Sequence, residues 1–171
     1  LTTRSTVSEH DPNDHEESGS SEGASRSGEI ASLMIQAPGS EVLEVPAILP
    51  ILPVRDVVVY PGVTMPLAIG RARSLEALDE AGQDGYLLVV SQRDPLTENP
   101  TLDELHEVGT IVRVMRIIDA RREGKQALVV GLARAVMTRT VTREPTLRVQ
   151  VQPLLEPPDE SPELEAAWKR A

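Results

Sequence analysis

The sequence predicts a mainly β fold, a small and mostly antiparallel β-barrel with one short covering helix. Apolar runs of strand length, rich in Val, Ile and Leu, recur from residue 48 to residue 153. One short segment, 75–81, has helical periodicity instead. Most connections between the runs are too short for the crossovers that parallel strands need. Roughly six or seven strands and one helix therefore fit a closed or nearly closed barrel.

The first predicted strand is 48–54 (ILPILPV), whose prolines favour a sheet edge or the entry into a barrel. Residues 56–62 (DVVVYPG) are interpreted as a β-branched run that ends in a turn at Pro61-Gly62. Residues 63–69 (VTMPLAI) predict a second strand, again interrupted by a proline.

Ser74 is the candidate N-cap of the predicted helix, and Gly82 is placed to end it. Three apolar residues of the helix share one face: Leu75, Leu78 and Ala81. The continuous apolar run 86–92 (YLLVVSQ) predicts a central strand that is buried on both faces. The polar stretch that follows predicts a loop with one turn of helix.

Residues 108–119 (VGTIVRVMRIID) predict a long strand. After a turn, 125–143 predict one long bent strand or two shorter ones, with a bulge at Gly131. The last strand alternates between apolar and polar side chains, which predicts an inward and an outward face. The inward set is Leu147, Val149 and Val151, and the outward set is Arg148, Gln150 and Gln152.

Composition divides the chain into three parts, which are 1–46, 47–156 and 157–171. Residues 1–29 hold too little apolar surface to offset the entropy of ordering, so we expect a disordered acidic N-terminal tail. The apolar patch in 30–46 is open to three interpretations, a transient helix, a docking segment or a loose linker, and we assign 1–46 to tail and linker. The barrel domain is 47–156. Residues 157–171 begin a C-terminal helix with Ser161 as N-cap, and the chain is expected to continue beyond it.

The charge is concentrated at one end of the chain. The net charge is −10, and residues 1–45 carry nine acidic residues against two arginines. An acidic tail and a nearly balanced body argue against nucleic acid as a partner, as do one Trp, two Tyr and no Phe. With no cysteine and no apolar run of about 20 residues, we expect neither disulfides nor a membrane span.

No motif for catalysis is found. Gly124-Lys125 lacks the spacing of a phosphate-binding loop and is interpreted as a hairpin turn. Neither Lys125 nor Lys169 has a setting that would desolvate a catalytic amine, and His106 has no predicted nucleophile beside it. His10 and His15 lie in the acidic tail, where we expect no ordered metal site. The chain is therefore predicted to have no catalytic residue, cofactor or metal of its own.

The remaining candidates for function are surface residues. A barrel of this size cannot enclose every apolar residue of 57–69, and the prolines there stiffen the backbone. We therefore predict an apolar binding surface with nearby polar contacts from two arginines that precede the helix. The candidate substrate-binding residues are Tyr60, Val63, Met65, Arg71 and Arg73.

Four stretches, taken together, resemble a known family. They are LPILPVRDVVVYPGVTMPLAIGRARSLEAL (49–78), LLVVSQRDP (87–95), DELHEVGTIVRVMRI (103–117) and LVVGLARA (128–135). In this order they are similar to the N-terminal domain of bacterial ATP-dependent Lon proteases, over about 48–156. The forms RDVVVYPG and LAIGRARS are closer to the full protease than to the stand-alone proteins of the family.

The resemblance implies a PUA-like β-barrel that helps to capture unfolded or damaged proteins and supports a hexamer in the cytoplasm. By itself the fragment would be a monomer or weak dimer. An ATPase domain that uses ATP and magnesium, and a protease domain with a Ser–Lys dyad, would lie beyond Ala171. The alternative is a stand-alone barrel that binds a partner protein or a small ligand without protease activity. RNA binding, the third hypothesis, is disfavoured by the charge and the scarce aromatics.

Overall fold

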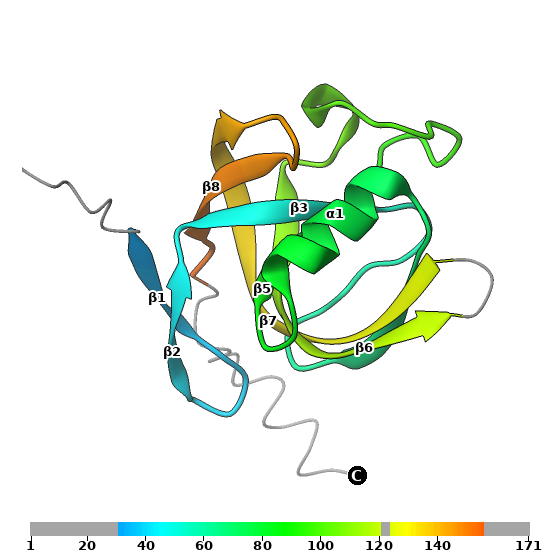
Figure 1. The fold of residues 1–171 in the computed structure, drawn as a ribbon. Coiled ribbons are helices and arrows are strands. Elements are labelled where there is room, and N and C mark those ends of the chain that lie inside the picture. Colours follow the sequence, from blue (N-terminus) through cyan, green and yellow to red (C-terminus); the bar gives the residue numbers. More distant parts are fainter. Residues whose placement is uncertain (1–30, 121–123, 156–171) are drawn as a thin grey trace, which may run out of the picture.

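The computed structural model describes residues 31–120 and 124–155. Its main sheet has the order β4–β7–β6–β5–β3–β8, and β8 also pairs with β7, so five of the strands close a ring and β4 lies beside β7 (Figure 1). The predicted mainly β barrel with one covering helix is therefore confirmed. The elements of the barrel are β3 (Ile48–Val54), β4 (Thr64–Ile69), α1 (Ala72–Ala81), β5 (Tyr86–Ser91), a 3-10 turn η1 (Leu102–Glu104), β6 (Val108–Ala120), β7 (Gly124–Thr142) and β8 (Arg148–Pro153).

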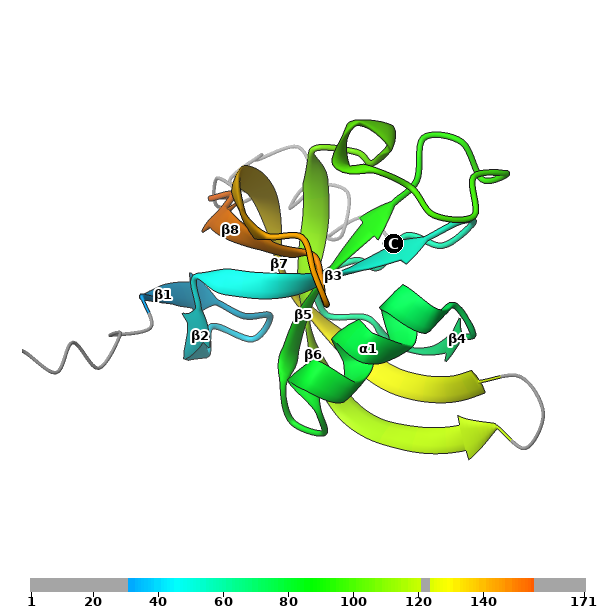
Figure 2. The ribbon, with the colours of Figure 1, turned by 45° about the horizontal axis from the view of Figure 1, so that its top comes forward.

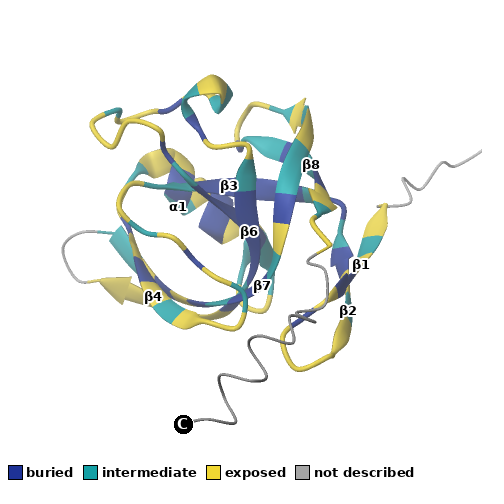
Figure 3. Ribbon diagram, turned by 180° about the vertical axis from the view of Figure 1, so that it is seen from behind, coloured by how far each residue is buried: buried dark blue, intermediate teal, exposed yellow. Residues whose placement is uncertain are grey.

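Two apolar clusters lie on opposite faces of the central strand β5, which is why its apolar run is continuous. Buried side chains alternate between them along the strand, with Leu88 and Val90 on one face and Leu87 and Val89 on the other. The first cluster, the barrel core, includes Leu49, Ile51, Ile111, Leu132, Val149 and Val151. The second, the helix-side core, lies under α1 and includes Leu52, Leu67, Leu78, Val112, Val114 and Val129. Figure 3 shows these buried segments converging where the strands cross.

The long strands β6 and β7 bend to serve both clusters. Their pairing shifts register between Ile111 and Val112, where Gly131 faces Val112 and Leu132 is left out of the ladder. The bulge predicted at Gly131 is therefore confirmed. The predicted faces of β8 are confirmed too, because Val149 and Val151 are buried while Arg148 and Gln152 lie outside the core.

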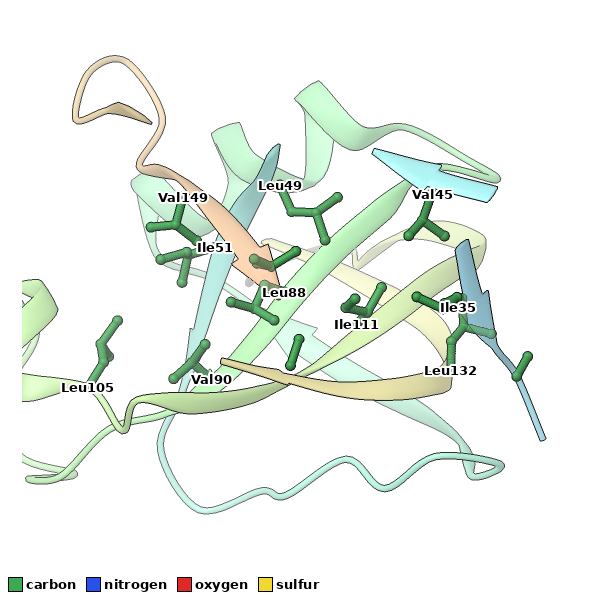
Figure 4. Packing of buried hydrophobic residues seen from close by; sticks show 13 residues of the cluster. Ile35, Val45, Leu49, Ile51, Leu88, Val90, Leu105, Ile111, Leu132 and Val149 are labelled. Atoms are coloured by element: carbon green, nitrogen blue, oxygen red, sulfur yellow. The ribbon is translucent and has the colours of Figure 1, made fainter. Parts of the chain in front are cut away.

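The expectation of a loose linker or transient helix before the barrel was wrong. Residues 32–46 form an antiparallel hairpin of β1 (Ser32–Gln36) and β2 (Val42–Pro46). Ile35 and Val45 point from the hairpin into the barrel core, near Leu132 and Leu49 (Figure 4). An isolated two-stranded hairpin is marginal in water, so this contact with the barrel core is what stabilises it. How the chain divides into domains remains a prediction.

Two further details differ from expectation. Strands β3 and β5 pair in parallel, because α1 provides the crossover between them. The helix begins at Ala72 with Arg71 as N-cap, and Ser74 is buried in the first turn rather than capping it. Gly82 does end the helix, where its N–H donates to the Leu78 carbonyl. The expectations for 1–29 and 157–171 fall outside the described residues.

Candidate functional site

The segment between β3 and β4 contains the β-branched run and joins no strand ladder. Two hydroxyl groups hold its backbone instead. The Ser91 Oγ donates to the Val57 carbonyl at 3.1 Å, and the Thr110 Oγ1 donates to the Val59 carbonyl at 2.6 Å. The segment still alternates, since Val59 is buried while Val58 and Tyr60 are 57% and 60% exposed.

The predicted turn at Pro61-Gly62 is confirmed, and it is clamped onto β7. The Val63 N–H donates to the Tyr60 carbonyl at 3.1 Å across the turn, and Gly62 has a φ of 81°. Two hydrogen bonds then join the turn to Gly131. The Gly62 N–H donates to the Gly131 carbonyl, and the Gly131 N–H donates to the Val63 carbonyl, both at 2.9 Å. A Cβ at Gly131 would lie 2.1 Å from the Tyr60 carbonyl oxygen, so the close approach requires glycine there.

Three apolar side chains are thus held outward on a fixed backbone. Val63 is 43% exposed, beside Val58 and Tyr60. We call Val58, Tyr60 and Val63 the apolar turn surface. A crevice of about 350 Å³ adjoins this surface. Val58 and Tyr60 line it together with the end of β5 and the start of β6.

The structure does not place Met65 on this surface. The side chains of β4 alternate, and Met65 is in phase with the buried Leu67 and Ile69, so it packs against the helix-side core. Whether Tyr60 and Val63 bind a substrate remains a prediction, but the exposed set includes Val58 in place of Met65.

Arg71 and Arg73 lie at the other end of β4 from Val63. Six strand residues separate them, which is about 20 Å at the rise of a β-strand. The five candidate residues therefore form two groups rather than one. Figure 2 shows β4 beside α1, on the side of the barrel away from the β1–β2 hairpin.

Arg71 is fixed by a buried glutamine that sequence reasoning missed. Its Nη2 donates to the Gln92 Oε1 at 2.6 Å, and the Gln92 Nε2 donates to the carbonyls of Asp94 and Thr97 at 3.1 and 2.8 Å. Gln92 is buried at the end of β5, so its amide has every partner it needs within this network. The polar pair Ser91-Gln92 at the end of an otherwise apolar run was the available signal.

Burial lowers the pKa of Arg71, and the nearby positive charge of Arg55 lowers it further, while Glu98 opposes the shift. An arginine remains charged at neutral pH even so. The Nη1 atom of Arg71 is buried and has no hydrogen-bond partner among the described residues. A fixed cation with an unused donor is therefore present at this end of β4.

A groove runs along the same end of β4. Its volume is about 390 Å³, and it separates Pro66–Arg71 from Leu52–Val57. The walls are largely apolar, with Arg55, Asp56 and Arg71 as the charged residues that line it.

The described residues show no array suited to catalysis. His106 is exposed, and Lys125 pairs with the Asp79 carboxylate. Within 31–120 and 124–155, no group of three His, Cys, Asp or Glu residues could hold a metal ion. None of the helices in these ranges is long and apolar enough to cross a membrane.

Residues 48–171 match the family model of the ATP-dependent protease La (LON) substrate-binding domain. The chain belongs to this family. Relatives of the LON domain include the Lon protease of Geobacter metallireducens, 38% identical over 133 residues that make up 76% of this chain. The Lon protease of Haemophilus influenzae is 39% identical over 107 residues, or 62% of this chain. The matched parts are 16% and 13% of these two proteins, so the chain spans a small part of their length.

Two solved Lon domains share the fold. The N-terminal domain of Mycobacterium avium complex Lon protease has a TM-score of 0.56 and 24% identity, and the match covers 72% of this chain and 62% of that one. A Lon N-terminal domain protein from Xanthomonas campestris has a TM-score of 0.52 and 22% identity, with 72% of each chain covered. At these identities the likeness establishes the fold alone.

Proposed function

We propose that this chain is the non-catalytic substrate-recognition and assembly module of an ATP-dependent Lon-type serine protease. Membership of the LON substrate-binding family and the match to Lon proteases support the proposal. The parent protein would degrade unfolded, damaged or regulatory proteins as a hexamer in the cytoplasm. Its ATP and magnesium would be bound, and its Ser–Lys dyad placed, beyond Ala171.

The observation that carries the proposal is the apolar turn surface. Unfolded proteins expose the apolar side chains that folded proteins bury, so a receptor for them needs exposed apolar groups. Val58, Tyr60 and Val63 supply such groups, and tyrosine is enriched at protein interfaces. Because the Ser91, Thr110 and Gly131 contacts already fix the backbone, binding costs little ordering entropy.

The test is the affinity of the chain for a permanently unfolded protein, such as fluorescein-labelled carboxymethylated α-lactalbumin, measured by fluorescence anisotropy. Replacing Val58, Tyr60 and Val63 together with serine should weaken binding roughly tenfold, because apolar contact area is lost. Urea denaturation of the same variant should show nearly unchanged stability, since the three side chains are exposed.

Val141→Ser is the matched control. Val141 is 42% exposed, a fraction similar to that of Val63, and lies ten residues beyond Gly131, or about 30 Å along the strand β7. The control should bind as the wild type does. Equal affinity of the triple variant and the wild type would contradict the assignment of this surface, and no binding by the wild type would contradict the proposed function.

A further inference from the structure

The open edge of β4 borders the groove. In the part of the chain that the structure describes, β4 pairs with β7 and with no second strand. The opposite wall of the groove is 52–57, whose carbonyls at Val54 and Val57 are already used by Gln92 N–H and Ser91 Oγ. Those two carbonyls are therefore occupied, whereas β4 has an edge without a partner strand among the described residues.

The register identifies which backbone groups face the groove. The Val63 carbonyl accepts from Gly131 on β7, so the backbone groups of residues 65, 67 and 69 also point toward β7. Those of Thr64, Pro66 and Ala68 point the other way. Pro66 has no N–H, and its place at an outward-pointing position is typical of edge strands. The carbonyls of Pro66 and Ala68 and the N–H of Ala68 therefore point toward the groove.

The groove has an apolar floor and a cationic end. Leu52, Leu67 and Ile69 are buried along it, and a volume of about 390 Å³ is near the lower end for ligand pockets. It therefore suits a few side chains of an extended chain rather than a folded element. Arg55, Asp56 and Arg71 are its charged residues, and Arg71 also lines a neighbouring crevice with Arg73 and Glu98.

We propose that this groove binds a short extended segment of an unfolded polypeptide as an added strand on β4, with a carboxylate of the segment held by Arg71 and Arg55. Two arginines, Arg55 and Arg71, against the single acid Asp56 make the groove cationic in a chain of net charge −10. Arg55 and Arg71 both line the groove, so their guanidinium groups provide the donors for that carboxylate. Backbone pairing tolerates many sequences, whereas the arginines select acidic ones. The inference rests on the proposed function and specifies how one class of substrate segment is held.

The test uses four fluorescein-labelled ten-residue peptides of alternating Val and Thr. The first is amidated and carries one Glu near its end, the second has Gln there, and the third has Gln and a free C-terminal carboxylate. A fourth peptide repeats the first with alternate amides N-methylated, which blocks strand pairing and leaves the side chains intact. We expect the Glu peptide to bind about tenfold more tightly than the Gln and the N-methylated peptides. The third peptide shows whether a chain terminus can replace an acidic side chain.

Two variants of the chain complete the test. Ala68→Pro removes the one edge N–H in the groove and repeats the arrangement that Pro66 already adopts, so it should fold as the wild type and bind the Glu peptide about tenfold less tightly. Arg55→Glu should abolish the preference for Glu over Gln, while Arg139→Glu, an exposed arginine on the second half of β7, should not.

Wild-type affinity in folded Ala68→Pro, or equal affinity for the methylated and unmethylated peptides, would overturn the strand-addition proposal. So would dimerisation of the wild type that Ala68→Pro abolishes, because the edge would then serve self-association. These outcomes leave the proposed function intact if the unfolded protein still binds through the apolar turn surface.

Discussion

Replacing Val45 with alanine tests whether the β1–β2 hairpin belongs to the folded unit. Val45 is 1% exposed and packs in the barrel core with Ile35 and Ala37. The change removes two buried methyl groups, which is about 1.6 kcal/mol of transfer free energy. The cavity left behind raises the expected loss of unfolding free energy to about 2–3 kcal/mol. For a chain of this length the melting temperature should fall by about 5–10 °C.

The assay is urea and thermal denaturation followed by far-UV circular dichroism. Val42→Ala is the control, since Val42 is on the same strand but 59% exposed, and its cost should stay below about 0.5 kcal/mol. Equal, small effects of the two substitutions would refute the docking of the hairpin and restore the linker interpretation. A separate early transition in Val45→Ala would mean that the hairpin unfolds independently of the barrel.

Three other predictions concern the barrel. Gly131→Ala should cost about 1–3 kcal/mol, because its Cβ would overlap the Tyr60 carbonyl, and should also weaken binding at the apolar turn surface; unchanged denaturation would contradict the close approach. Val149→Asp should unfold the domain while Gln150→Lys costs less than about 0.5 kcal/mol, and the reverse would mean that the faces of β8 are exchanged. The hydrogen bond to Asp79 raises the pKa of Lys125, so the small stabilisation by this pair should be constant from about pH 6 to 9 and be lost as the pH rises through the raised pKa. A Lys125→Met variant whose deficit grows above about pH 10 would contradict that sign.

Local sequence patterns predicted the elements whose stability is local or whose alternation is regular. The continuous run of β5, the alternation of β8 and the bulge at Gly131 all follow from side-chain periodicity and glycine placement. The hairpin was missed although its turn at Pro38 and Gly39 gives a recognisable signal. Its few apolar residues gain their stability from the barrel, which a local pattern cannot show.

The sequence predicted only part of the candidate site, because non-local contacts decide the rest. Tyr60 and Val63 are exposed, as expected if the barrel cannot enclose every apolar residue of 57–69. The pleat of β4 turns Met65 inward. The segment 56–60 has the composition of a strand, yet Ser91 and Thr110, which lie 34 and 51 residues away from their acceptors, hold it outside every ladder. A separation of 21 residues likewise hid the link between Arg71 and Gln92. Non-local contacts of this kind decide where an otherwise ambiguous segment lies.

Hydrogen–deuterium exchange of the chain with and without a bound unfolded protein tests most directly whether the apolar turn surface binds substrate. The amides of 57–60 lie outside the sheet ladders, so they should exchange quickly in the unbound chain and any protection by a ligand will be visible. On binding, we predict that the amides of 57–63 become protected from exchange, while exchange in 32–46 and in the second half of β7 stays unchanged. Binding that leaves 57–63 unprotected and protects the hairpin instead would contradict it.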